Sequence, residues 1–366
     1  MAEETRKRKS DHINICADKK AQAKKITTGF EDVHLVHKAL PEINKESIDP
    51  SSRFLQHKFA APIIVGAMTG GTAEAVKING AIAEAVEELG LGMGLGSQRA
   101  GIEDAKLEST FSIARKKAPT AFLIANIGGV QLVNGYGARE VKKAVEMAGA
   151  DAVAIHLNAL QETIQPEGQT NFKGIITKIG EIARALDQPV IVKETGAGIA
   201  AEEAKELESA GVKGIDIGGA GGTSFAAVEY YRTIGETAIQ RSLGQAFWDW
   251  GIPTAISLVE TTQSVKLPVI ASGGLRSGID VAKALALNAS LTSLSQPILQ
   301  AAMKGALETK RILSYMIEEL RNVMFLLGTQ KISSLARVPV VINGKTGEWL
   351  RARNFRIEEY ATRGAH

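Results

Sequence analysis

The sequence has little cysteine and no long apolar run. Cys16 is the single cysteine among 366 residues. One thiol forms no disulfide within the chain and no zinc site made of several cysteines. No apolar run reaches the roughly 18 residues that a membrane span requires. Residues 1–18 are polar and charged, so we expect no signal peptide, no membrane partner and a cytoplasmic protein.

The charge of the sequence is close to balance. The 43 basic and 40 acidic residues leave a net charge of +3, which is too even for a nucleic-acid-binding protein. Proline is scarce, at 10 residues, whereas glycine is abundant, at 37. The length fits two average domains, or one α/β barrel of about 250 residues with additions.

Short apolar runs recur along the chain from residue 61 onward. Near-continuous apolar runs are typical of parallel strands that are covered on both faces. Amphipathic stretches such as 73–89 and 201–210 separate them, so β and α units alternate and predict a TIM (β/α)8 barrel. The eight runs are 61–68, 91–96, 121–127, 152–158, 189–194, 214–219, 268–274 and 290–295.

Three parts of the chain fall outside this rhythm. Residues 1–60 form a basic N-terminal extension that we expect to be rich in loops, and residues 331–366 form a C-terminal tail. The barrel itself spans 61–330, with an insertion near 235–251. We expect residues 304–327 to be helical and to pack on the outside of the barrel.

Two glycine-rich turns follow predicted strands. Residues 218–223 (GGAGGT) and 272–276 (SGGLR) stand at carboxyl ends, where barrel enzymes place their chemistry. Glycine lets a backbone approach a phosphate, and a following helix offers free N–H groups. Such turns also serve packing alone. The second turn follows the seventh strand, a common phosphate position, so together they favour a ligand with a phosphate tail.

Other strand ends carry polar side chains. Lys193 is a Schiff-base nucleophile, a cation that faces an electron-rich ring, or a structural lysine with its tip in solvent. His156 and Asn158 share one face of a strand, and Gln161 and Glu162 follow them. This group could hold a diphosphate with Mg²⁺ on the carboxylate. The alternative is a buried structural histidine beside a polar loop.

The N-terminal extension contains a cationic cluster. Residues 6–12 read RKRKSDH. Such a cluster is either a solvated tail or an arm that folds over an anionic substrate. The other histidines of the chain show no spacing typical of metal ligands.

Taken together, these motifs resemble those of type 2 isopentenyl diphosphate isomerase, a flavin-dependent barrel enzyme. The turns 221–223 and 273–278 are shared more widely among FMN barrels. The resemblance runs from about residue 8 to about residue 330. Its most specific parts are 8–12 (RKSDH), 68–71 (MTGG), 96–99 (GSQR), 156–162 (HLNALQE), 165–168 (QPEG) and 192–194 (VKE).

The resemblance implies an enzyme that converts isopentenyl diphosphate to dimethylallyl diphosphate. It implies reduced FMN, Mg²⁺, NADPH as the reductant, and a homotetramer or homo-octamer. Glu162 would hold the metal, and Arg8, Lys9, Arg99, His156, Asn158 and Gln161 would hold the substrate. FMN would be held by Gly66, Ala67, Met68, Ser97, Asn126, Lys193, Thr223, Gly274, Arg276, Ser295 and Gln296.

The chemistry adds a proton to one carbon of an alkene and removes a proton from another. Reduced flavin could serve as this acid and base, with Lys193 stabilising an anionic ring. Gln161 could relay a proton, and His156 and Glu229 are further catalytic candidates. In one departure, Ser293 replaces a glycine that the family usually has in the eighth strand, so contacts at Ser295 and Gln296 could differ.

Three other functions compete with this interpretation. An α-hydroxyacid oxidase needs a histidine base beyond the sixth strand, where residues 218–223 contain none. A barrel-type nucleotide dehydrogenase would need a cysteine in a mid-chain loop, and Cys16 stands far too early. A non-catalytic flavin-binding protein would bind the cofactor without turnover.

Overall fold

We describe the fold from a computed structural model of the chain. The structure describes residues 2–18, 21–232 and 238–364, with side chains of the first helix from Arg8 onward. The predicted insertion, 235–251, therefore lies partly outside the described residues. Its remainder contains α11 (Ala238–Ala246), the buried Trp248 and the exposed Trp250.

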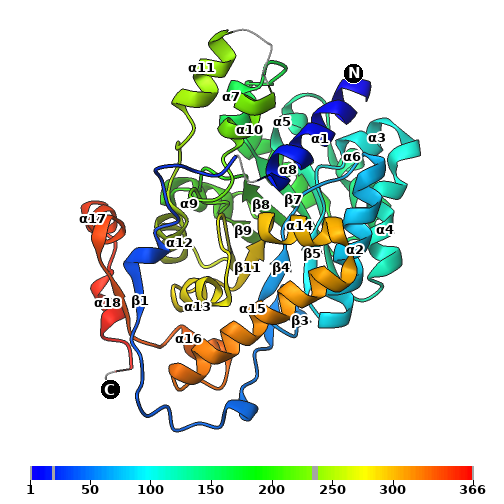
Figure 1. Ribbon diagram of the computed structural model, residues 1–366. Helices are drawn as coiled ribbons and strands as arrows, with labels where there is room; N and C mark the ends of the chain where they lie inside the picture. Colours follow the sequence, from blue (N-terminus) through cyan, green and yellow to red (C-terminus); the bar gives the residue numbers. More distant parts are fainter. Residues whose placement is uncertain (1, 19–20, 233–237, 365–366) are drawn as a thin grey trace.

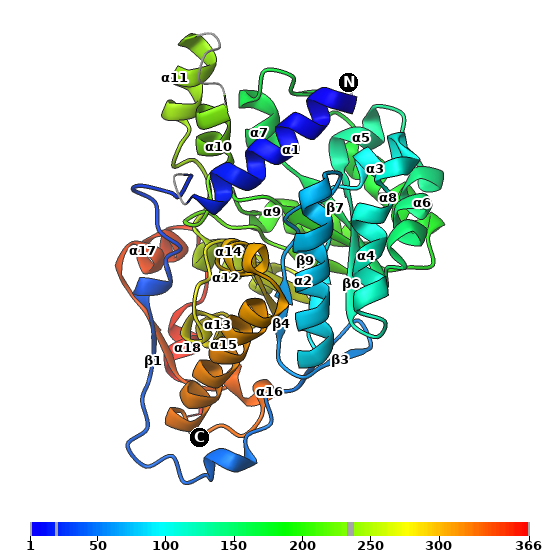
Figure 2. The same cartoon turned by 45° about the vertical axis from the view of Figure 1, so that its right-hand side comes forward.

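Eight parallel strands close into a barrel, as the sequence predicted. Seven strands lie within their predicted apolar runs, β6 extends one residue past its run to Gly128, and the last strand pairs with the first. The helices surround this barrel (Figures 1 and 2). The strands are β4 (Ile63–Val65), β5 (Gly92–Gly94), β6 (Phe122–Gly128), β7 (Ala152–Leu157), β8 (Val190–Glu194), β9 (Gly214–Asp216), β10 (Val269–Ser272) and β11 (Leu291–Leu294).

The strand register gathers polar residues at one end of the barrel. Gly128 pairs with His156, His156 with Lys193, and Lys193 with Asp216. Neighbouring parallel strands therefore deliver these side chains side by side at their carboxyl ends. That end is where the site must be sought.

The helices begin and end where local sequence signals stand. Thr72 caps α2 by accepting a hydrogen bond from the Ala75 N–H, and Gly90 ends it in the left-handed conformation. The predicted helix 73–89 matches α2. The other helices are α3 (Arg99–Glu103), α4 (Ser109–Lys117), α5 (Gly129–Val133), α6 (Ala138–Ala148), α7 (Ala159–Ile164), α8 (Ile175–Ala185), α9 (Ala201–Ser209), α10 (Phe225–Arg232), α12 (Thr254–Ser264), α13 (Gly278–Ala286), α14 (Gln296–Lys304) and α15 (Ala306–Leu326).

The N-terminal extension is more ordered than expected. It begins with a helix, α1 (Ala2–Ala17), where the sequence predicted loops. This helix packs against α3, α10 and α14 and lies over the carboxyl end of the barrel (Figure 2). Its inner face carries Arg8, Lys9 and His12 beside Ile13 and Cys16. A mostly polar inner face produces no apolar periodicity, which is why the sequence pattern missed the helix.

A hairpin late in the extension covers the other end of the barrel. After η1 (Phe30–Asp32), β1 (Val33–Leu35) and η2 (Lys45–Ser47), the strands β2 (Ser52–Phe54) and β3 (His57–Phe59) form an antiparallel hairpin. Phe54 and Phe59 pack edge-on against Phe122 of β6. This aromatic cluster belongs to the apolar layer inside the barrel.

The C-terminal segment folds back onto the extension. After α16 (Ile332–Leu335), β12 (Val340–Ile342) pairs antiparallel with β1, and α17 (Gly344–Ala352) and α18 (Glu358–Ala361) follow. Figure 1 shows these elements side by side at one flank of the barrel. No helix in the described part of the chain is both long enough and apolar enough to cross a membrane.

Glu260 of α12 anchors α17 to the barrel. Its buried carboxylate accepts hydrogen bonds from Trp349 Nε1 at 3.0 Å and from Arg353 Nε at 3.0 Å and Nη2 at 2.9 Å. Glu260→Ala should lower the free energy of unfolding by about 1.5–3 kcal/mol, because Trp349, Arg353 and the buried Ala201 N–H all lose a charged acceptor. Urea denaturation measures this loss.

An exposed ion pair provides the control for that experiment. Glu359 contacts Arg356 at 3.1 Å on the surface of the C-terminal segment. Glu359→Ala should change the free energy of unfolding by less than about 1 kcal/mol. Equal losses of unfolding free energy in the two variants would show that Glu260 does not anchor α17.

Candidate active site

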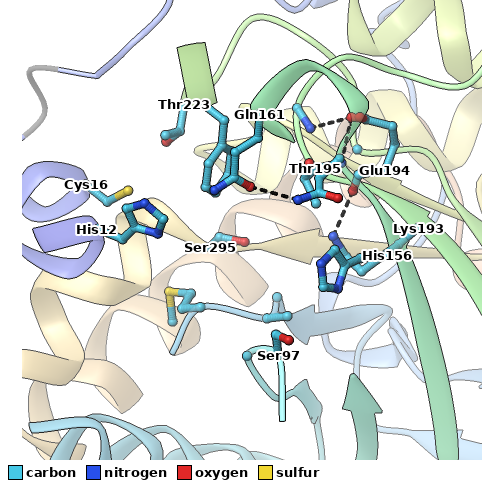
Figure 3. Close-up of a pocket in the computed structure, with 18 of the residues that line it drawn as sticks. His12, Cys16, Ser97, His156, Gln161, Lys193, Glu194, Thr195, Thr223 and Ser295 are labelled. Carbon is cyan, nitrogen blue, oxygen red and sulfur yellow. Dashed lines mark hydrogen bonds between the residues drawn. The ribbon is translucent and has the colours of Figure 1, made fainter. Parts of the chain in front are cut away.

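One cavity at the carboxyl end of the barrel contains nearly every predicted site residue. Its volume is about 290 Å³. Of the predicted residues, Glu229 alone does not line the cavity. Figure 3 shows His12 and Cys16 of α1 on the opposite side of this cavity from His156 and Lys193. The predicted residues that line it are Arg8, Lys9, Gly66, Ala67, Met68, Ser97, Arg99, Asn126, His156, Asn158, Gln161, Glu162, Lys193, Thr223, Gly274, Arg276, Ser295 and Gln296.

Cations from α1 and α3 gather at one side of the cavity. Lys9 Nζ donates to the Ser97 carbonyl at 2.8 Å. Burial, together with the charges of Arg8 and Arg99, lowers the pKa of Lys9 to about 7. Arg99 pairs with Glu103 at 2.8 Å. An anion bound here would relieve the repulsion between the cations and raise the pKa of Lys9 again.

His156 lies in the cavity wall as a neutral imidazole. Its Nδ1 lies 2.7 Å from Asn126 Oδ1. The Asn126 amide donates to the Leu95 carbonyl at 2.9 Å, which turns Oδ1 toward the ring and requires a proton on Nδ1. Burial, with the charges of Lys193 and Lys9, lowers the pKa of His156 to about 3.

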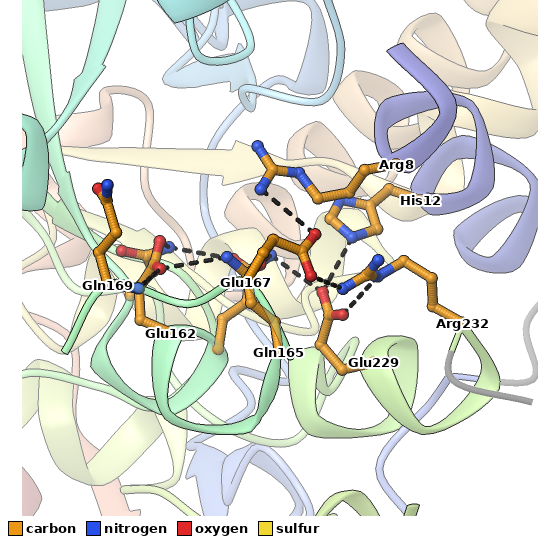
Figure 4. A network of polar contacts seen from close by, with 10 residues as sticks. Arg8, His12, Glu162, Gln165, Glu167, Gln169, Glu229 and Arg232 are labelled. Atoms are coloured by element: carbon orange, nitrogen blue, oxygen red, sulfur yellow. Dashed lines mark hydrogen bonds and ion pairs between the residues drawn. The ribbon is translucent and has the colours of Figure 1, made fainter. Parts of the chain in front are cut away.

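The β7–α7 turn builds a network of amides around Glu162. Asn158 Nδ2 donates to Glu162 Oε1 at 2.9 Å, and Gln165 Nε2 and the Gln169 N–H donate to Oε2 at 3.1 and 2.7 Å. Figure 4 shows this network beside Arg8 and His12 of α1, the helix that we call the arm. Asn158 Oδ1 is buried without a partner, so the turn presents an unused oxygen next to a carboxylate.

Glu229 lies behind this network rather than in the cavity. Its fully buried carboxylate accepts from Gln161 Nε2 at 3.3 Å, from His12 Nε2 at 2.9 Å and from Arg232 Nε at 2.6 Å. Burial opposes ionisation of Glu229, but His12 and Arg232 outweigh it and lower the pKa of the carboxyl. Gln161 therefore connects the cavity to a buried, ionised carboxylate.

Two residues of the network, Arg232 and Glu167, were not predicted from the sequence as site residues. Arg232 pairs with Glu229 and also with Glu167 at 2.7 Å, and Arg8 lies 3.6 Å from Glu167. The motif 165–168 contains Glu167 and could have indicated it. Arg232 stands at the end of α10 in no recognisable motif, so no sequence signal pointed to it.

The two glycine turns meet at another part of the cavity. A Cβ on Gly222 would lie 2.6 Å from the Gly274 nitrogen, so a side chain there has no room. Arg276 Nη1 donates to Gln296 Oε1 at 2.8 Å, while Gln296 Nε2 is buried without a partner. A cation, an unpaired N–H donor and exposed turn backbone suit a phosphate ester, so these residues fit the phosphate of FMN.

Ser293, the departure in the eighth strand, lies beside Gly66. A Cβ on Gly66 would lie 2.7 Å from Ser293 Oγ and 2.3 Å from Ser295 Oγ. The absence of a side chain at Gly66 leaves space for both hydroxyls at the cavity wall. The serine in β11 is therefore accommodated across the β4–β11 pair.

Lys193 occupies the cavity floor. Its Nζ donates to the Glu194 carbonyl at 2.8 Å. The Glu194 carboxylate in turn accepts from the N–H groups of Thr195, Gly196 and Ala197. Lys193 is therefore held by a neutral oxygen, and its charge remains available to an electron-rich ligand.

The described residues contain no group of three His, Cys, Asp or Glu side chains that could hold a metal ion. Four carboxylates line the cavity, those of Glu162, Glu167, Glu194 and Asp216, and Glu162 is the one beside the unpartnered Asn158 Oδ1. This arrangement suits Mg²⁺ that takes most of its ligands from substrate phosphates and water.

The closed eight-stranded barrel is of the FMN-dependent type, and the FMN-dependent dehydrogenase family matches residues 138–341. A lactate oxidase structure from Pediococcus acidilactici shares the fold, with a TM-score of 0.63 at 18% identity over 94% of each chain. The isopentenyl-diphosphate delta-isomerase of Methanothermobacter thermautotrophicus is 50% identical over 97% of this chain and 99% of that protein. The Pyrococcus abyssi enzyme of the same name is 50% identical over 96% of each chain.

The chain therefore belongs to the isopentenyl-diphosphate delta-isomerase family. This result confirms the resemblance that the motifs carried. The oxidase likeness, at its low identity, concerns the barrel fold alone.

The lowered pKa of His156 makes stability depend on pH. Below the unfolded-state pKa of about 6.5, the unfolded chain binds a proton that native His156 does not, so stability falls as pH falls, by up to about 1.4 kcal/mol per unit. His156→Asn should show a smaller loss between about pH 6.5 and pH 5 in urea denaturation. The exposed His37→Asn change controls for general loss of an imidazole. An unchanged loss in His156→Asn would contradict the assignment.

Proposed function

We propose that the protein interconverts isopentenyl diphosphate and dimethylallyl diphosphate, with reduced FMN as cofactor and Mg²⁺ on the substrate diphosphate. The observation that carries this proposal is a single cavity with two anion sites. One consists of the cations beside Lys9 and Arg99, and the other of the glycine turns beside Arg276. Apolar side chains, including Met68 and Leu299, line the same cavity and suit a short hydrocarbon chain.

In this proposal the arm and the β7–α7 turn bind the diphosphate. Arg8, Lys9 and Arg99 supply positive charge. Asn158 and Gln161 line the cavity beside the diphosphate, with their amide N–H groups donating to Glu162 and Glu229. His156, with its Nδ1 proton fixed on Asn126, presents Nε2 to the substrate. An adjacent diphosphate would favour the protonated ring and allow Nε2 to donate.

Reduced FMN, when bound, supplies the acid and base that move a proton at the alkene. Lys193 holds a positive charge toward the ring, and a Schiff base is disfavoured because an alkene diphosphate offers no carbonyl carbon. Gln161 links the substrate to Glu229, which suits a proton relay with the ionised carboxylate as acceptor. Helix α1 excludes water from the reacting carbons.

Glu162 would hold Mg²⁺ by one carboxylate oxygen against the diphosphate. The Asn158 and Gln165 amides orient that carboxylate, as outer partners orient metal ligands elsewhere. The metal would neutralise diphosphate charge that remains because Arg8 and Arg99 already interact with Glu167 and Glu103.

Three further properties stay predictions. The resemblance implies NADPH as the reductant and assembly into a homotetramer or homo-octamer, and the polar N-terminus with a single cysteine predicts residence in the cytoplasm. Oxidation of a hydroxyacid finds no support at the site, because residues 218–223 offer no histidine base. A protein that only binds flavin would not need the hydrogen bond between Gln161 and Glu229.

Anaerobic turnover tests the proposed reaction directly. The purified protein with Mg²⁺ and photoreduced FMN should convert ¹³C-labelled isopentenyl diphosphate to dimethylallyl diphosphate, measured by NMR. The same mixture with oxidised FMN is the control and should give little product. Tight flavin binding with no product under reducing conditions would refute the enzyme activity and leave a binding protein.

Glu162→Gln tests the metal role. The variant should need at least about tenfold more Mg²⁺, because a neutral amide replaces the charged ligand. Substitution of a residue that only orients a metal ligand already weakens metal binding by about this factor. Its FMN affinity should stay unchanged. Glu206→Gln, at an exposed position on α9, is the matched control. An unaltered Mg²⁺ dependence would remove Glu162 from the metal site.

A further inference from the structure

A short segment after the arm lies against the glycine turns of the second anion site. We call residues 21–28 the strap. The Ser224 N–H donates to the Ala21 carbonyl at 2.8 Å, and the Ala23 N–H donates to the Gly222 carbonyl at 2.9 Å. The strap backbone is therefore hydrogen-bonded along the β9–α10 turn, the same turn that contributes Thr223 to the cavity.

The strap is fixed by protein contacts of its own. Asp249 Oδ1 accepts from the N–H groups of Lys24, Lys25 and Ile26 at 2.7, 3.0 and 3.3 Å. Trp248 Nε1 donates to the Gln22 carbonyl at 2.9 Å. The insertion between β9 and β10 thus holds the strap in place, and the position of Gln22 is determined before any ligand enters.

Gln22 reaches from the strap to two residues of the phosphate cradle. Its Oε1 accepts a hydrogen bond from Arg276 Nη2, and its Nε2 donates to Thr223 Oγ1 at 3.4 Å. Gln296 holds the other terminal nitrogen of the same guanidinium. Arg276 is therefore clamped between two amide oxygens that come from opposite ends of the chain.

Neutral partners matter for this arginine. An amide oxygen orients a guanidinium without cancelling its charge, whereas a carboxylate at the same position would form an ion pair. The carboxylate of Asp280, which interacts electrostatically with Arg276, accepts from the Arg276 main-chain N–H. The side-chain hydrogen bonds of the guanidinium go to the neutral oxygens of Gln22 and Gln296.

We propose that Gln22 is a positioning residue for the flavin phosphate. It orients Arg276 and the Thr223 hydroxyl toward the phosphate and brings no negative charge to the guanidinium. Since the strap continues from α1, flavin binding and docking of the arm are coupled, and each favours the other. This inference rests on the proposed function only in taking the phosphate to be that of FMN.

Comparison of FMN with riboflavin, which lacks the phosphate, tests this inference without turnover. Gln22→Met keeps the side-chain volume but removes the acceptor, and should weaken FMN binding about tenfold, the size of one hydrogen bond to a charged group. Riboflavin affinity should stay unchanged. Gln22→Glu should weaken FMN binding further, and added salt should reduce its deficit. Flavin fluorescence quenching measures each dissociation constant.

The control variant and the wild type separate the possible outcomes. Lys25→Ala changes an exposed side chain of the strap and should leave the ratio of FMN to riboflavin affinity unaltered. Equal losses for both flavins in Gln22→Met, or no loss for FMN, would overturn the role of Gln22. Equal affinity of the wild type for FMN and riboflavin would instead refute the phosphate site on which the proposed function stands.

Discussion

The site depends on positive charge that is held in place by neutral oxygens. Lys9 donates to the Ser97 carbonyl, Lys193 to the Glu194 carbonyl, and Arg276 to the amide oxygens of Gln22 and Gln296. None of these contacts cancels a charge. Arg8 and Arg99 instead lie beside carboxylates, those of Glu167 and Glu103. The cavity is therefore organised for anions before they arrive.

This arrangement costs stability in the empty protein. The lowered pKa values of Lys9 and His156 express the cost, because burial and neighbouring cations disfavour another charge. The closed barrel tolerates this loss of stability, because apolar strands and the Phe54–Phe122 cluster keep the backbone in one register. A bound phosphate would return part of this free energy as affinity, which is preorganisation in the usual sense.

The sequence predicted the barrel well because buried parallel strands are continuously apolar, and each of the eight runs contains a strand. It also predicted the residues of the cavity, since most stand at strand ends or in motifs. It failed for α1, whose inner face is polar, and it could not place Glu229 behind Gln161. Gln22 carries no motif, and its role depends on a fold that brings residues 22 and 276 together.

The N-terminal segment contacts both anion sites. Helix α1 brings Arg8 and Lys9 to the side of Arg99, while the strap brings Gln22 to Arg276. A barrel without α1 and the strap would retain Arg99 and Arg276. It would lose Arg8, Lys9 and Gln22. Because the same stretch of backbone contacts both sites, the proposed binding of the flavin phosphate beside Arg276 would favour docking of α1 beside Arg99 and would so prepare the cavity for the diphosphate.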